Sequence, residues 1–486
     1  PALMACSVAV LRVLEKLTNK KLPNLADYLC GHSLGEYTAM TAAGVFSLKE
    51  CAVLLKLRGN AMQESVPLGQ GAMAAFIGVD IDTTQKILNE VQTIGICDVG
   101  NDNADGQVVI SGDKSAVEKA IEFKDVKRYF LNEVDTYKIV FVNGVYSSWL
   151  SETTHTNYDV CTFSAATKKY AEVLEKYFSS IAPKDEAMVA LNTAFAKDGA
   201  FIRVPKNQTV NKPIEVVYLT TDEGRELMIQ PRNLVVAEEG SHVQIIERHQ
   251  SLSSSLVFTN SVTEIYASNN AKVSYYKVQN DIKTASLVDS TSVKQERDSH
   301  VNVGTFSFGG KFTRNNLNFF MAGENIESHM DGITILEEGQ FVDHHTLADH
   351  QQPNCYSREL YKSIFDDNSK GVFNGKVMVH RDAQKTNAFQ SNNNLLLTDK
   401  ASIDTKPQLE IYADDVKCSH GCTIGQLDEE ALFYLRSRGI PEKEAKAMLM
   451  YAFSNDALDH VHIPELKTKL NLLIAKKLGV DLEFEL

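Results

Sequence analysis

The chain has 486 residues, enough for two or more domains, and its hydrophobic content of 43% is ordinary for a globular protein. A net charge of −14 argues against nucleic-acid or anionic-membrane partners, because binding phosphates needs a basic surface. No apolar run reaches the ~20 residues that span a bilayer.

The chain begins without an initiator Met or a basic leader, so we expect it to be cut from something longer and to start inside a domain. Its eight cysteines lack disulfide-like spacing, which favours a reducing compartment, and we expect the cytoplasm. Most should be buried free thiols, Cys355 among them. Only Cys418 and Cys422 lie close together in the sequence.

Residues 1–123 alternate helical and strand-like patterns, with helices expected at 36–43 and 48–62 and a strand at 73–79. This alternation indicates an α/β arrangement. Residues 31–35 fit G-x-S-x-G after an expected short strand and before a helix, which is the context that a nucleophile elbow requires.

The elbow and its neighbours resemble an internal fragment of the malonyl-CoA:acyl-carrier-protein transacylase family. The matching segments are 31–37, 57–59, 69–73 and 101–112. The resemblance implies Ser33 as the acyl-carrying nucleophile, with Arg58 and Leu34 binding substrate. In that role the Arg58 fork would hold the malonyl carboxylate, and acyl-carrier protein would be the partner.

The fragment lacks a base for the serine. The family's catalytic histidine has no counterpart, because the next histidine after His32 is His155, which carries no such motif. A serine without a positioned base is a poor nucleophile. We therefore expect an incomplete, inactive fragment and keep transacylation as the alternative function.

Residues 199–425 change in character to short β-rich runs separated by polar turns, several of them about 30 residues apart. This pattern fits an all-β sandwich and a coiled β-solenoid equally well. Asparagine-rich segments at 315–316 and 392–394 suit either stacked ladders or turns. His344, His345 and His350, with neighbouring aspartates, look metal-like, but we expect them in a surface turn.

The last stretch, residues 426–486, turns helical. Pro441 and Pro464 each open a helix, as proline does at a first helical position. The apolar stripes of these helices favour core packing, with partner docking as a second possibility.

Residues 124–486 resemble the SufD family of the SUF iron–sulfur cluster scaffold. The matching segments are 139–144, 194–200, 230–234, 364–367, 371–376, 406–421 and 432–441. The resemblance implies an α/β entry segment at 124–198, a right-handed parallel β-helix at 199–425 and a small helical domain at 426–486. It also implies partners: a SufB subunit along the β-helix and the SufC ATPase on the helices.

Cys418, His420 and Cys422 are the leading candidate site. In an extended chain, residues i, i+2 and i+4 point to one face, and two thiolates with an imidazole suit iron or a persulfide. Three ligands do not close a tetrahedral site. The resemblance implies that Cys418 and His420 support a cluster held transiently and shared with the partner, with no tightly bound cofactor in this chain alone. For Cys422 we prefer a packed thiol to a tentative metal ligand.

The expected whole is mixed in fold: a truncated α/β acyltransferase-like fragment, a mainly-β parallel β-helix and a C-terminal helical domain. We expect a SufD-like scaffold subunit that acts with SufB and SufC and has no turnover of its own. The missing histidine and the family's missing N-terminal helical domain both fall at the junction, which suggests two truncated reading frames joined together.

Overall fold

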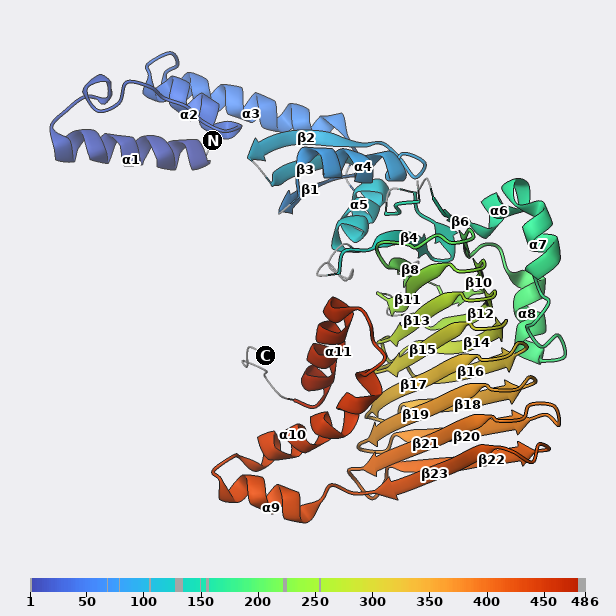
Figure 1. Ribbon diagram of the computed structural model, residues 1–486. Coiled ribbons are helices and arrows are strands. Elements are labelled where there is room, and N and C mark those ends of the chain that lie inside the picture. Colours follow the sequence, from blue (N-terminus) through green and yellow to red (C-terminus); the bar gives the residue numbers. More distant parts are fainter. Residues whose placement is uncertain are drawn as a thin grey trace. The chain divides into compact units, whose positions relative to one another are not determined.

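The computed structural model describes residues 2–67, 69–77, 79–104, 106–126, 134–148, 150–153, 157–221, 225–252 and 255–479. The chain forms two compact units, Pro1–Arg128 and Tyr129–Leu486, drawn from blue through red in Figure 1. No helix in the described ranges is both long and apolar enough to cross a membrane.

The first unit combines helices with a small antiparallel sheet of order β1-β3-β2. Its longest helix, α3, begins with a capping box in which Ser47 and Glu50 satisfy each other's backbone N–H groups. The α/β arrangement expected from the sequence is confirmed. The elements are α1 (Ala2–Thr18), η1 (Leu22–Asn24), α2 (Leu34–Ala42), α3 (Leu48–Ser65), β1 (Gly71–Ile77), α4 (Ile81–Val91), β2 (Cys97–Ala104), β3 (Gln107–Asp113) and α5 (Lys114–Val126).

The second unit opens with short strands and helices that lead into a stack of coils. They are β4 (Tyr137–Val142), β5 (Val145–Tyr146), β6 (Asp159–Thr162), α6 (Phe163–Lys169), α7 (Ala171–Tyr177), α8 (Ala187–Phe195), β7 (Ala200–Val204), β8 (Ile214–Thr220), β9 (Leu227–Ile229) and β10 (Arg232–Ala237). Helices α6 and α7 pack on the outer face of one sheet, where Leu174 meets Phe201 and Leu234.

The coils themselves are long strands of near-equal length. They are β11 (His242–Ser251), β12 (Val257–Ala267), β13 (Lys272–Gln279), β14 (Ala285–Gln295), β15 (His300–Ser307), β16 (Phe312–Met321), β17 (Glu327–Leu336), β18 (Phe341–His350), β19 (Tyr356–Phe365), β20 (Lys370–Val379), β21 (Asn387–Leu396), β22 (Ser402–Ile411) and β23 (Lys417–Gly425). From β7 and β8 onward each long strand pairs in parallel with the next but one, so the chain alternates between two facing sheets. This is the expected parallel β-helix, stacked from β8 to β23 in Figure 1.

One corner of the coil repeats from each turn of the solenoid to the next. Asn270, Asp298 and Asn354 all take positive φ angles, a conformation that asparagine and aspartate tolerate. Their N–H groups bond to the next coil, Asn270 to Arg297 at 2.9 Å for example. The asparagine-rich segments 315–316 and 392–394 lie in β16 and β21, so they form strands and not turns.

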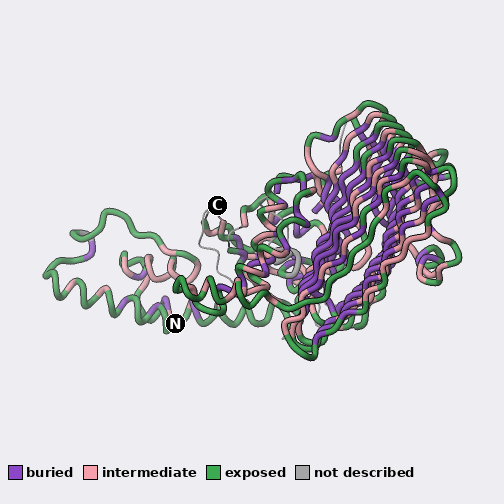
Figure 2. Tube along the Cα trace, turned by 60° about the horizontal axis from the view of Figure 1, so that its bottom comes forward, coloured by how far each residue is buried: buried purple, intermediate pink, exposed green. Residues whose placement is uncertain are grey.

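The interior between the two sheets is mainly aliphatic and aromatic, and it appears as the purple rows of Figure 2. Helices α9 (Glu429–Ser437), α10 (Glu442–Asn455), η3 (Asp456–Leu458) and α11 (Pro464–Lys477) follow the last coil. Met450 and Leu470 pack with Tyr276 and Ile333 on the outside of the β11–β21 sheet, so α10 and α11 serve as core. Helix α9 has no buried residue, and Phe433 is 74% exposed.

Candidate functional site

The predicted Cys–His–Cys run forms the last strand of one sheet, β23, at the open end of the solenoid. Cys418 pairs with Ala388 and His420 with Gln390, both of which are buried residues of β21. The three side chains therefore continue an inward-facing row. In the described residues no further coil covers this row, so His420 and Cys422 are exposed.

The row is too open to hold one ion by itself. Residues two apart in a strand are about 7 Å apart, so Cys418 and Cys422 stand ~13 Å from each other. His420 between them can share an ion with one cysteine at a time. A Cβ added at Gly421 would meet nothing within 4 Å, so the outer face of β23, opposite to His420, is uncovered as well.

Cys418 is the more protected of the two thiols. Its side chain is half-buried and packs against the solenoid core. Burial raises the pKa of this thiol, so the protonated form is favoured until a metal or an acceptor draws the proton away. The site therefore holds its soft ligand at the edge of an apolar interior.

A polar column runs inward from His420. Gln390 lies beneath His420 in the register, and Glu359 lies beneath Gln390. Gln390 Nε2 donates to Glu359 Oε2 at 3.1 Å, and Thr346 Oγ1 donates to the same oxygen at 2.6 Å. Burial raises the pKa of Glu359 to about 7, so this carboxyl can hold or release a proton near neutral pH.

The sequence does not reveal this column, because its members lie about 30 residues apart in successive coils. Only the register between coils brings Glu359, Gln390 and His420 together. An isolated glutamate in a β-rich run carries no signal of such stacking.

A second group deep inside the coils was also missed. The ligand atoms of Glu247, His249 and Asp289 lie within 4.8 Å of one another. The Lys277 ammonium bonds to Asp289, and His249 bonds to Glu247 at 3.0 Å. Burial opposes ionisation of Glu247, but the hydrogen bond and charge of His249 together with Lys277 lower its pKa to about 2. We interpret the group as a buried charge network, because an ammonium repels a cation.

The expectation for His344, His345 and His350 was wrong. They lie in strand β18 and not in a surface turn, and His344 and His350 are buried. Thr334 Oγ1 bonds His344 Nε2 at 2.9 Å, and Ser357 Oγ bonds His350 Nε2 at 2.8 Å. Burial lowers the pKa of His344 to about 4 and that of His350 to about 3, so both are neutral core residues.

The first unit contains a formed elbow. Ser33 has φ 53° and ψ −109° at the start of α2, a strained conformation for a residue with a side chain. A Cβ on Gly31 would lie 2.0 Å from the backbone carbon of Gly35, so the turn closes only around glycine. The sequence therefore predicts the tight turn and the helix after it correctly, but the short strand expected before the turn is absent, because residues 28–30 form no strand.

The side chain that hydrogen-bonds to the Ser33 hydroxyl donates to it and does not accept its proton. Arg58 Nη2 donates to Ser33 Oγ at 3.1 Å, and His32 points instead to Asn103 at 2.7 Å. In the described parts of the chain no histidine bonds to Ser33, and His155 lies outside the described residues. A guanidinium cannot accept the hydroxyl proton, so this geometry does not activate the serine.

Comparison with protein families matches two models to the chain. The SUF system FeS cluster assembly SufBD core domain matches residues 218–453. The SufBD protein N-terminal region matches residues 114–216, so this match begins within residues 1–123, the part whose motifs resemble the transacylase family.

Among similar proteins, an iron–sulfur cluster assembly SufBD family protein from Synechocystis is 32% identical over 73% of this chain and 81% of its own length. The iron–sulfur cluster assembly protein SufD of Escherichia coli is 31% identical over 71% and 80%.

Solved structures of acyl-carrier-protein S-malonyltransferases also match. The Bartonella henselae enzyme is 49% identical over 26% of this chain, and the Burkholderia pseudomallei enzyme 45% over 20%. Their TM-scores are 0.24 and 0.19, and this chain spans 40% and 31% of the two enzymes.

Proposed function

The chain belongs to the SufBD family of iron–sulfur cluster assembly proteins, and from this premise we propose that it is a SufD-like scaffold subunit whose open solenoid end receives a nascent cluster. The observation that carries the proposal is the uncovered inward row of β23, where His420 ends the polar column above Glu359 and Cys418 lies two residues before it. The cluster is cargo here and not a resident cofactor.

The open end explains why a partner is needed. Cys418 and His420 supply at most two neighbouring ligands, one soft thiolate and one imidazole, while a cluster needs several. A SufB-like subunit that added its own strands beside β22 and β23 would cover the row and bring the remaining ligands. Edge-strand addition is a common mode of association, because an unpaired edge offers a row of hydrogen-bonding groups.

The C-terminal helices offer a second contact. Helix α9 leaves Phe433 and Tyr434 exposed beside a groove of about 730 Å³ that Leu432 and Arg436 line. Exposed aromatic side chains of this kind are typical of interfaces. We assign this groove to a SufC-like ATPase.

The test is assembly of the complex from cells with measurement of bound iron and sulfide. The full chain is expressed with SufB-like and SufC-like subunits, and His420→Ala and Cys418→Ser should each lose most of the bound cluster while the subunits still co-purify. Cys422→Ser, a change at the end of the same row, should keep it. A normal cluster content in His420→Ala would remove the site from the proposal.

We assign no acyl transfer to the elbow unit. Ser33 faces the Arg58 guanidinium, and none of its described hydrogen bonds goes to a group that could accept its proton. The elbow is thus a formed turn without the base that the reaction needs.

A further inference from the structure

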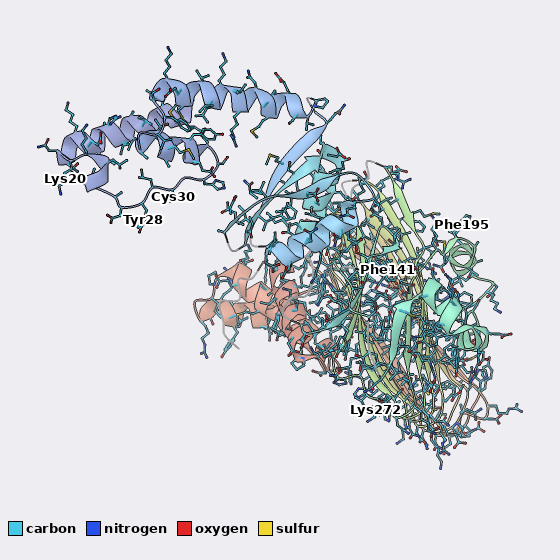
Figure 3. The ribbon with its side chains drawn as sticks, turned by 90° about the horizontal axis from the view of Figure 1, so that it is seen from above. Lys20, Tyr28, Cys30, Phe141, Phe195 and Lys272 are labelled. Carbon is cyan, nitrogen blue, oxygen red and sulfur yellow. The ribbon has the colours of Figure 1, made fainter. Side chains whose placement is uncertain are left out.

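A histidine-rich pocket lies on the outer face of the β11–β17 sheet, away from the inward row of β23. Its volume is about 430 Å³, and the segment between η3 and α11 covers one side. Lys272, labelled in Figure 3, lies on its wall. Five of the chain's 13 histidines line it: His242, His300, His329, His460 and His462.

The parallel register gathers these residues from distant parts of the sequence. His242, Lys272, His300 and Glu327 occupy matching positions of four successive strands in the same sheet. His329 lies two residues beyond Glu327 on β17 and so faces the same side. No local motif marks the site, because each coil contributes only one or two of its side chains.

The remaining two histidines are fixed by the sheet below them. The Tyr276 hydroxyl donates to the His460 carbonyl at 2.9 Å and accepts from the His462 N–H at 2.9 Å. Asn302 also donates to the His460 carbonyl. The backbone that carries both imidazoles is therefore pinned over the pocket.

Carboxylates set the tautomers of three of these rings. His460 Nδ1 donates to Asp331 Oδ2 at 2.7 Å, and His329 Nε2 donates to Glu327 Oε1 at 2.8 Å. His300 Nδ1 pairs with the other Glu327 oxygen at 2.9 Å. Because a carboxylate only accepts, the opposite nitrogen of each neutral ring keeps its lone pair.

This pattern is the one that metal-binding histidines use, with one nitrogen donating to a carboxylate and the other free to ligate. Among the described residues, His329 Nδ1 is buried without a hydrogen-bond partner, and the same holds for Asp331 Oδ1 on a side chain that is 2% exposed.

We propose that this pocket binds a divalent transition-metal ion of the zinc type, with His329 and His460 as ligands and exposed His462 turning inward as the third. The rings of His329 and His460 lie 4.0 Å apart between centroids, and those of His460 and His462 lie 6.3 Å apart. Imidazoles suit zinc, copper, nickel and iron, and the carboxylates behind them favour a cation over an anion.

The ion would tie the segment before α11 to the solenoid, and so fasten the C-terminal helices. His460 and His462 come from that segment, whereas His329 comes from β17. The site is independent of the cluster proposed at β23, since it uses the outer face of the sheet and different residues.

The test is titration of the chelator-treated full chain with Zn²⁺ by calorimetry and with Co²⁺ by visible absorption. The starting protein carries Cys418→Ser, His420→Ala and Cys422→Ser, which removes the row at the open end. We expect one equivalent to bind, and His329→Ala, His460→Ala and Asp331→Asn each to weaken binding by at least about 10-fold. The control His380→Ala removes an imidazole that pairs with Asp349 on the other sheet, and it should leave the affinity for Zn²⁺ unchanged.

His462→Ala guards against a folding artefact, because this side chain is exposed and its loss should weaken zinc binding without changing the circular dichroism. Bound zinc should also raise the thermal midpoint of the starting protein and not that of His460→Ala. Absence of zinc binding in the starting protein, or binding that survives the joint loss of His329 and His460, would overturn the proposal.

Discussion

The elbow unit and the solenoid differ in how they complete a site. In the elbow unit a strained serine turn is formed, yet large side chains such as Leu17, Tyr28 and Leu57 stay exposed, and the core joining α1 to α3 centres on Met4, Val8, Cys51 and Leu55. In the solenoid almost every strand is covered on its inner face. A strained local turn thus forms in a unit with a small core, whereas a site that gathers distant residues needs the surrounding fold.

Acylation of Ser33 gives the sharpest contrast between the units. We expect the tryptic peptide that carries Ser33 to remain unmodified after incubation of the chain with malonyl-CoA, because loss of the base lowers the rate by several orders of magnitude. Intact-mass and peptide mass spectrometry measure this. A malonyl increment that disappears in Ser33→Ala would show that the elbow is active and would break the contrast.

The two units should also differ in how fast a protease cuts them. Exposed apolar surface and a small core favour local opening, so protease should cut within residues 2–126 about 100-fold faster than within 255–425. Time-resolved digestion of the full chain followed by mass spectrometry gives both rates. Equal rates would mean that the elbow unit is as stably folded as the coils.

Glycine substitutions test the packing of the coils against that of the open end. A Cβ on Gly323 would lie 2.2 Å from the Arg297 nitrogen, whereas one on Gly421 meets nothing within 4 Å. We expect Gly323→Ala to lower the free energy of unfolding by about 3 kcal/mol and Gly421→Ala to change it by less than about 0.5 kcal/mol. Urea unfolding of both variants measures the two changes in the free energy of unfolding. Changes of similar size would contradict the close approach of the backbone at Gly323.

The buried Glu359 gives the smallest effect, and it depends on pH. Its folded-state pKa of about 7 lies above the ordinary 4.5, so the folded state holds this proton more tightly than the unfolded state. The contribution of protonated Glu359 to the free energy of unfolding is fully present below pH 4.5, and it is lost as the pH rises through 7. Relative to Glu359→Gln, the wild type should lose about 2 kcal/mol between pH 5 and pH 7.5. Calorimetry measures the free energy of unfolding of both proteins at the two pH values. A difference between wild type and Glu359→Gln that is the same at pH 5 and pH 7.5 would contradict the raised pKa of Glu359.

Part of this structure could be predicted from the residues. The polar segments around Asn270 and Asp298 predict turns, and both lie at a corner of the coil. Alternation in an extended chain also places Cys418 and His420 on one face. Periodicity alone left sandwich and solenoid open, because both consist of short strands between turns. The choice depends on register between coils, which a linear pattern does not contain.

The errors have a related cause. Asp343 and His344 look solvent-exposed in a sequence, yet the coil interior accepts His344 because Thr334 and Asn315 bond both of its nitrogens. The column below His420 and the outer histidine pocket were missed for the same reason, since neighbours in space come from successive coils.

Our proposal places the function of this chain at the open end of the solenoid and not at the elbow. It is tested most directly in cells that lack their own SufD-like protein, by the activity of a cluster-dependent reporter enzyme. Full-length chains with Ser33→Ala and with His420→Ala are compared at equal abundance. We predict that Ser33→Ala restores the reporter as the unmodified chain does and that His420→Ala does not, and the reverse result would contradict the account.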